Sequence, residues 1–421
     1  MTGRGDTLRA MAMRAALALL LAGLVTGCAS YSSRVVNARI DFHAGRYDLA
    51  ASELESLAAR EDNDQLLYLM DLGVVRFAAG QYKQAIEAFL RADKLVAFVD
   101  YTSVSGEAAG LLLNENVQAY RGEDFEKLLI HVYLAMAFTF SEQWESALVE
   151  CRRVNHELDL MISKGKRPYE NNAFAKYLAA TLFEARGELN SAFVDYRQLL
   201  KWGHEDFPLL PAPLMRVSEK LAATQELETY RRKFPGVSKF RLGSDEAEIV
   251  LLVERGKAPV KVPSYQFHLV PMFIKTGYLS DHVVLRGKAG GWSGRSHTLF
   301  DIEKIAIHEL AQRIARITAK KIAGMVAKEA AAYGVQKATD SKFLGALTSL
   351  FLHASDQADL RSWTTLPAAL QVARVTLPAG RHDLVLDMVT ADGREIKAVK
   401  EWPGVVLKPG QRLFLSYRTT D

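Results

Sequence analysis

Cysteine is nearly absent from the sequence, which has only Cys28 and Cys151. Cys28 belongs to the N-terminal segment considered below, which leaves Cys151 without a partner for an internal disulfide. An excess of charge of one sign is also missing, because 53 Lys and Arg residues oppose 49 Asp and Glu residues, a formal net charge of +4. This balance argues against nucleic acid as a general partner. Stability must come from packing of a chain that is 49% hydrophobic.

Long apolar runs are scarce as well. The run from Ala15 to Val25 is roughly half of the ~20 apolar residues that a membrane-spanning helix needs, and no other run comes close to that length. We therefore expect no permanent transmembrane span. The run follows three basic residues, Arg4, Arg9 and Arg14, and this order is typical of a secretory signal.

The signal ends in Val25-Thr26-Gly27-Cys28, which resembles the bacterial lipobox. The resemblance implies that Cys28 receives diacylglycerol, that residues 1–27 are removed as a lipoprotein signal peptide, and that a further acyl chain such as palmitate is then added. Residues 28–36 would form a lipidated tether, and two or more acyl chains give stable membrane attachment. An ordinary secretory signal that happens to end near a cysteine is the alternative.

The residue after the lipidated cysteine is Ala29, where many Gram-negative bacteria use aspartate to retain a lipoprotein in the inner membrane. The resemblance therefore implies a lipid anchor at the periplasmic face of the outer membrane. The mature chain would have 394 residues (421 less 27), enough for two domains.

Residues 37–235 show a repeating helical pattern. In its clearest copy, Gly80-Gln81-Tyr82 forms a turn, and Ala85, Phe89 and Ala92 follow at helical spacing. This pattern resembles the tetratricopeptide repeat (TPR), a pair of antiparallel helices. Further turns near Gly45, Trp144 and Gly187 predict four such pairs. Stacked pairs form a solenoid with a concave surface that binds peptides or proteins, unless the chain's own C-terminal half or an insertion fills it.

The spacing of the repeats requires an insertion near residues 96–125. Its polar residues Asn116, Tyr120 and Arg121 are the candidates for contacts with a protein partner. The alternative is that these three residues only cap and close the insertion.

Residues 245–421 have a different pattern, which predicts an α+β domain and makes the whole protein α+β, with an all-α N-terminal part. We expect strands within 247–300, a long helix at 301–335 and antiparallel strands within 368–418. Arg313, Arg316 and Lys320 share one face of the long helix. They either dock to lipid or glycan phosphates or form an ordinary solvated helix face.

The mature chain resembles a family of bacterial TPR lipoproteins that has no established biochemical activity. The resemblance rests on four features and covers most of the chain: the lipobox, the stretch with Asn114-Glu115-Asn116, Tyr120 and Phe125, the segment Ala258-Pro259-Val260-Lys261 after Gly256, and the cluster Asp359, Arg361, Trp363, Leu366 and Pro367. It transfers no catalytic residues. In the last cluster we expect a structural role, with Asp359 paired to Arg361 and Trp363 in the core.

Catalytic and metal-binding patterns are incomplete. His308-Glu309 begins like a zinc-protease helix, but Gln312 stands where the second histidine is required. We therefore predict no metal, no cofactor and no enzymatic activity. The preferred hypothesis is a non-catalytic envelope adaptor that binds protein partners through its repeats. The alternative is a cell-wall hydrolase or glycan-binding protein with its site in the C-terminal domain.

Overall fold

The computed structural model describes residues 30–103, 118–163, 172–339, 341–354 and 357–419. The lipobox and Cys28 lie outside these ranges. The chain divides after Asn37, and the short helix α2 (Tyr31–Arg34) belongs to the first unit. Residues 38–421 form one compact unit that contains both helices and sheets.

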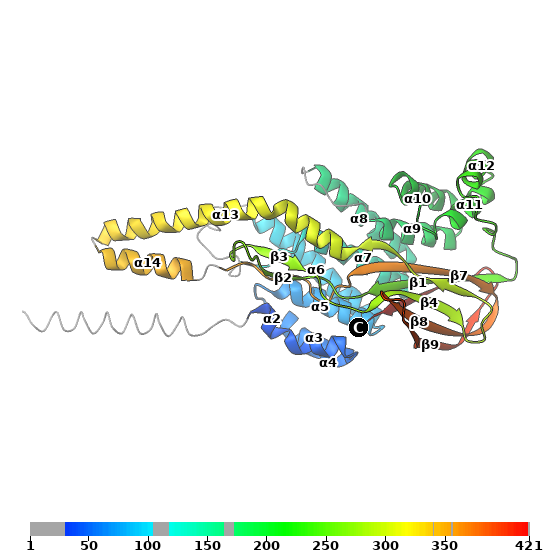
Figure 1. Ribbon diagram of the computed structural model, residues 1–421, viewed down its shortest axis with the longest axis horizontal. Helices are drawn as coiled ribbons and strands as arrows, with labels where there is room; N and C mark the ends of the chain where they lie inside the picture. The colour runs from blue at the N-terminus through cyan, green and yellow to red at the C-terminus, as the bar shows by residue number, and fades with distance from the viewer. Residues whose placement is uncertain (1–29, 104–117, 164–171, 340, 355–356, 420–421) are drawn as a thin grey trace, which may run out of the picture. The chain divides into compact units, whose positions relative to one another are not determined.

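Consecutive helical pairs make up the first half of this unit (Figure 1). The pairs are α3 (Val36–His43) with α4 (Tyr47–Ala58), α5 (Gln65–Ala78) with α6 (Tyr82–Ser103), α7 (Asp124–Phe140) with α8 (Trp144–Ser163), α9 (Ala173–Ala185) with α10 (Leu189–Lys201), and α11 (Pro211–Lys220) with α12 (Thr224–Lys233). The repeats are therefore TPR-like, and α6 extends into the predicted insertion.

The described residues contain five pairs, one more than the four predicted. Proline is favoured in the first turn of a helix, and Pro211 begins α11, the first helix of the fifth pair. The turn inside each pair places one residue in the left-handed region. Glycine occupies that position in three turns, whereas Glu142 and Ala222 occupy it in the other two, with φ of 58° and 53°. The glycine signal is therefore missing from the turn that joins α11 to α12.

The contact between α5 and α6 depends on a glycine. A Cβ atom at Gly73 would lie 2.4 Å from the ring of Phe89, so no larger residue fits without movement. Ala85 on α6 is fully buried. The ring of Phe89 also stacks on the ring of Tyr133 of α7, with 5.3 Å between the centroids. This contact links the pair α5–α6 to the pair α7–α8.

The second half of the unit is built on two four-stranded sheets and a small two-stranded one. Their orders are β10-β1-β7-β6, β5-β4-β8-β9 and β2-β3. The strands are β1 (Glu246–Arg255), β2 (Val260–Pro263), β3 (Pro271–Ile274), β4 (Ser280–Gly287), β5 (Ser293–Arg295), β6 (His297–Asp301), β7 (Ala369–Pro378), β8 (Gly380–Thr390), β9 (Glu395–Leu407) and β10 (Arg412–Arg418). Pairing is antiparallel, as predicted, except that β1 and β10 are parallel.

Both faces of β1 are buried, which explains its continuous apolar sequence. Side chains alternate along a strand, so Ile249 and Leu251 point to the second sheet, where they join the core formed by β4, β7 and β8. Glu248 and Glu254 point the other way, toward the helical pairs, where their hydrogen-bond partners lie. The sheet β10-β1-β7-β6 is thus the middle layer between the helices and the second sheet.

The remaining helices, α13 (Ile302–Thr339) and α14 (Lys342–Ala354), lie side by side as a helical hairpin (Figure 1). The first part of α13 packs on β3, β7 and α7. We call this hairpin the arm. Within the described residues no helix is both long enough and apolar enough to cross a membrane.

Candidate functional site

The concave surface of the helical pairs is occupied by the protein's own sheet. Tyr82 of α6 contacts Ser416 of β10 at 3.2 Å between hydroxyl oxygens, and Trp144 of α8 packs edge-on against Phe414. Deeper in the interface, Tyr133 of α7 donates a hydrogen bond to Glu254 of β1. The sequence left open that the chain's own C-terminal half fills the concave surface, and the strands β1 and β10 do so. Where these two strands lie, the surface is not free for a partner.

Five buried charged residues hold this interface together, and we call them the ion cluster. They are Glu184 on α9, Arg216 on α11, Glu248 on β1, Arg374 on β7 and Arg412 on β10. Arg374 lies 2.9 Å from Glu184 and 2.8 Å from Glu248, and Arg216 lies 2.7 Å and 3.0 Å from the same two carboxylates. Burial alone would raise the pKa of Glu184, but the three arginines outweigh it and lower that pKa to about 2. The cluster is fully paired and structural.

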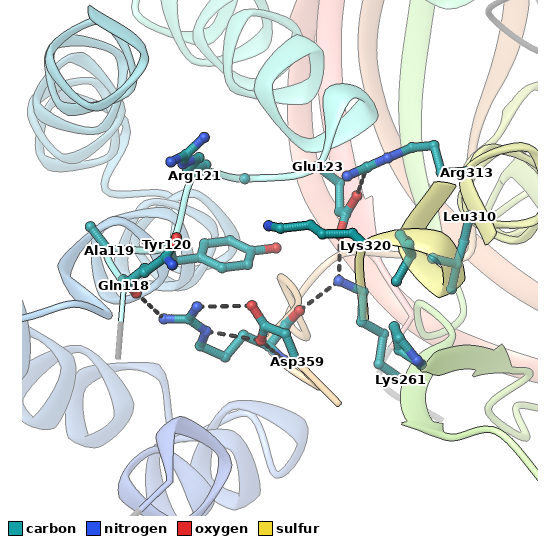
Figure 2. A pocket seen from close by; sticks show the side chains of 14 residues that line it. Gln118, Ala119, Tyr120, Arg121, Glu123, Lys261, Leu310, Arg313, Lys320 and Asp359 are labelled. Atoms are coloured by element: carbon teal, nitrogen blue, oxygen red, sulfur yellow. Dashed lines mark hydrogen bonds and ion pairs between the residues drawn. The ribbon is translucent and has the colours of Figure 1, made fainter. Parts of the chain in front are cut away.

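A cavity of about 200 Å³ opens where the segment before α7 meets α13, and Figure 2 shows its lining. Arg313 and Lys320 enter from α13, Lys261 from β2 and Arg361 from the segment after α14. Arg121 lies at the edge and is exposed. Because these five side chains are all cationic, we call this space the cationic cavity.

Glu123 fixes two of these cations. It is the N-cap residue of α7 and forms a capping box with Glu126, so its position is set by the start of the helix. Its carboxylate binds both Lys261 and Arg313 (Figure 2). Burial would raise the pKa of Glu123, but Lys261 and Arg313 lower it to about 2. Glu123 is therefore ionised at neutral pH and holds both cations at the wall of the cavity.

Arg361 is fixed from three sides. Its guanidinium donates to Asp359 at 2.8 Å, to Asp64 at 3.1 Å and to the carbonyl of Gln118 at 3.0 Å. The group also lies over the ring of Tyr120, 5.2 Å from its centroid. The nearby Trp363 is buried and its backbone N–H donates to Glu126. The motif Asp359, Arg361, Trp363 thus joins the first helical pairs to the segment that leads into β7.

Three residues were proposed for partner contact, and the structure places them differently. Asn116 lies outside the described residues. Arg121 is exposed. Tyr120 is only 5% exposed, because its ring lies under Arg361 and its hydroxyl donates to the buried Glu126 at 2.6 Å. The expectation of a surface position for Tyr120 was therefore wrong, and its place in the lining of the cavity is structural.

Sequence reasoning missed the role of Glu309, next to the cavity on α13. Its carboxylate accepts a hydrogen bond from the backbone N–H of Phe125 at 3.2 Å. Burial, with the charges of Asp124 and Glu123, raises the pKa of Glu309 to about 8. In the sequence, Glu309 was considered only together with His308, as part of an incomplete zinc-protease motif. Its raised pKa could not be predicted, because the charges that cause it, Asp124 and Glu123, are distant in the sequence.

The cavity offers little for acid–base chemistry. A glycosidase needs a carboxylic acid of raised pKa beside a second carboxylate, both facing the substrate. Glu309 has a raised pKa but is not among the residues that line the cavity. The two carboxylates in the lining, Glu123 and Asp359, are bound to cations, which outweigh the effect of burial and lower both pKa values. Among the described residues, no group of three or more His, Cys, Asp or Glu side chains is placed to hold a metal ion. Burial raises the pKa of Cys151 to about 12, so its thiol is unreactive.

No protein-family model matches the chain, and no curated protein matches it. A MamA RS-1 double mutant is 15% identical in sequence, and the match covers 48% of this chain and 90% of that one with a TM-score of 0.32. A putative kinesin light chain of Podosopora anserina, with nearly identical TPR-like repeats, is 16% identical over 49% of this chain and 93% of its own, with a TM-score of 0.33. Similarity at this level carries no argument about function.

Proposed function

We propose that the protein is a lipid-anchored scaffold of the bacterial cell envelope that binds protein partners and catalyses no reaction. In this proposal it belongs with the TPR lipoproteins that its sequence resembles. Cys28 carries the lipid, and the folded chain works at the periplasmic face of the outer membrane. The lipobox supports the anchor, and the balanced charge agrees with a partner other than nucleic acid.

The observation that carries the binding role is the exposed apolar face of the arm. Ile322, Val326 and Tyr333 on α13 are 52%, 66% and 64% exposed. Their spacing of four and seven residues places them on one side of the helix. Phe343, at the start of α14, is 64% exposed as well. Apolar side chains that recur on one helix face are typical of protein interaction sites.

The arm replaces the concave groove as the expected site of partner binding. In many TPR-like solenoids the inner face is the binding surface. Here β1 and β10 cover that face and the ion cluster fixes them. A partner of the folded protein must therefore use another surface, and the arm presents the apolar one.

Site-specific photo-cross-linking in cells tests this role. A photoreactive amino acid at Val326 should give adducts with a protein partner, whereas the same group at Val194, 56% exposed on α10, should not. The double variant Ile322→Glu, Val326→Glu should lose the partner and keep its thermal unfolding temperature, because both positions are exposed. Adducts that contain only lipid or a second copy of this chain would refute the scaffold role. So would equal adducts from both positions.

A further inference from the structure

We propose that the outer edge of β10 binds an extended segment of a protein partner, which adds to the sheet as a further strand. The strand order β10-β1-β7-β6 gives β10 a neighbouring strand on one side only. The site is separate from the arm, so it is a second interaction surface beyond the one in the proposed function. Three observations support it: the outward backbone groups of β10, the contrast with the other sheet edges, and a groove beside the strand.

Alternate residues of β10 point their backbone groups away from β1. At one end of the pairing Glu248 donates its N–H to the carbonyl of Gln411, and at the other end Thr419 donates to the carbonyl of Glu254. The register between these two bonds is unbroken, so the odd-numbered residues of β10 bond to β1. The outward-facing residues are therefore Arg412, Phe414 and Ser416. In the part of the chain that the structure describes, no hydrogen bond reaches their outward N–H and C=O groups.

The other edges of the two large sheets are protected against strand addition, whereas β10 is not. β9, an edge of the second sheet, contains Lys397, Lys400 and Pro403 and has two register shifts against β8. β5 and β6 are short, and β6 has a register shift as well. Short strands, bulges, lysine and proline are devices that prevent pairing at an edge. β10 is seven residues long, pairs without interruption and contains neither lysine nor proline.

A groove of about 550 Å³ lies beside the first half of β10. Its aromatic lining comes from Phe140 at the end of α7, Trp144 at the start of α8 and Phe414 of β10. Two charged residues line it. Arg412 is paired in the ion cluster, whereas Glu142 is exposed and forms no ion pair with any described residue. An added strand can place an apolar side chain against the aromatic rings and a lysine or arginine beside Glu142.

The surroundings of the edge favour a single extended segment over a second copy of the chain. Tyr82 at the start of α6 and Trp144 at the start of α8 contact Ser416 and Phe414, so both helices lie against β10. An added peptide needs only the width of one strand, about 4.8 Å. Two copies that paired through this edge would each bring these helices to the same interface. The expected ligand is therefore a flexible segment with apolar residues at alternate positions and a cationic residue.

Peptide selection tests the proposal on the complete mature chain with Cys28→Ser, which leaves it unlipidated. The probe is a phage-displayed library of random dodecapeptides, from which the enriched peptide is synthesised with a fluorophore. We expect this peptide to bind in fluorescence anisotropy, with apolar residues at alternate positions and at least one lysine or arginine. N-methylation of its amides one at a time should weaken binding at every second position, because alternate N–H groups face β10.

Two substitutions at one position separate the backbone from the side chain. Ser416→Pro removes the outward N–H and should weaken peptide binding at least tenfold, whereas Ser416→Ala removes only the hydroxyl and should leave binding unchanged. Glu142→Lys should weaken binding about threefold, the effect of an exposed ion pair, and Glu61→Lys, at an exposed position elsewhere, should not. The arm variant Ile322→Glu, Val326→Glu should bind the peptide normally, which distinguishes this site from the one in the proposed function.

The proposal fails if no peptide is enriched, if N-methylation acts equally at adjacent positions, or if Ser416→Pro and Ser416→Ala bind the peptide equally. A dimer in sedimentation analysis that Ser416→Pro dissociates would show that a second copy occupies the edge, and this too would overturn the proposal. Thermal unfolding shows whether each variant is folded. If Ser416→Pro is unfolded, the methylated peptides decide the question on the chain without that substitution.

Discussion

Tyr133 and Glu254 form a hydrogen bond between the third helical pair and the central strand β1, although 121 residues separate them in the sequence. Arg418 of β10 binds the same carboxylate at 2.9 Å. Both partners of Glu254 are buried, and burial raises the pKa of Tyr133 well above its usual range. The bond is one of the contacts between the repeats and the sheet, which belong to the same compact unit.

Removal of one carboxylate from the ion cluster should destabilise the protein strongly. Glu248→Gln leaves Arg216, Arg374 and Arg412 with Glu184 as their only carboxylate within the cluster. A buried charge without its partner costs about 3–5 kcal/mol. Urea unfolding of the mature chain measures the loss. Glu205→Gln is the control. It removes an ion pair with Lys233 in which both side chains are exposed, so the free energy of unfolding should change by about 0.5 kcal/mol or less. Equal midpoints for the two variants would contradict the role of the cluster.

Two helical glycines should respond in opposite ways to alanine. Gly73→Ala places a methyl group against the ring of Phe89, and such overpacking costs about 1–3 kcal/mol. Gly334 on α13 is exposed and has no atom within 4 Å of the added Cβ. Gly334→Ala should therefore stabilise the helix by up to about 1 kcal/mol. Thermal unfolding of both variants checks the pair, and a stable Gly73→Ala variant would mean that α5 and α6 are not in close contact.

The raised pKa of Glu309 predicts a stability that falls as pH rises. The folded protein keeps this proton up to about pH 8, whereas the unfolded chain releases it near pH 4.5. The folded state thus binds more protons between these values, and stability declines across that window. Glu309→Gln should show a flatter decline, since its amide oxygen can still accept from Phe125 and carries no charge. Unfolding temperatures from pH 5 to 9 measure the difference, and identical slopes for variant and wild type would show that Glu309 is ionised in the fold.

Cys28→Ser should release the protein from the membrane. Without the thiol no diacylglycerol can be attached, and the chain remains unprocessed or becomes soluble. Membrane fractionation with radiolabelled palmitate shows both effects at once. A wild-type protein without label that still fractionates with outer membranes would exclude lipidation at this cysteine.

The sequence predicted the architecture where periodicity is local. The TPR-like packing was predicted from the turn at Gly80 and from the small residues Gly73 and Ala85. Such features can be read from sequence because helical spacing and left-handed turns depend on residues that are close together in the chain. The strands around Ile249 and Leu386 were recognised by the same principle. The fifth helical pair was not predicted, and its turn, like that of the predicted third pair, has a residue other than glycine in the left-handed region.

The candidate site was less accessible from sequence. The cationic cavity combines Arg121, Lys261, Lys320 and Arg361, which come from four separated segments, and no spacing rule connects them. The basic face of α13 was noted, but Arg313 turned out to be paired with Glu123, 190 residues away. Tyr120 was a candidate for partner contact, whereas its hydroxyl donates a hydrogen bond to the buried carboxylate of Glu126.

The parallel pairing of β1 with β10 has a consequence for how the chain acquires its fold. Glu248 and Arg412, neighbours in this pairing, are 164 residues apart, so the inner face of the helices cannot be covered completely until β10 has been synthesised. Non-local pairing of this kind slows folding. Until then Tyr82 and Trp144 lack their partners on β10, Ser416 and Phe414, and are exposed to solvent and to other chains. A nascent or newly exported molecule therefore passes through an aggregation-prone stage, during which we expect it to depend on chaperones.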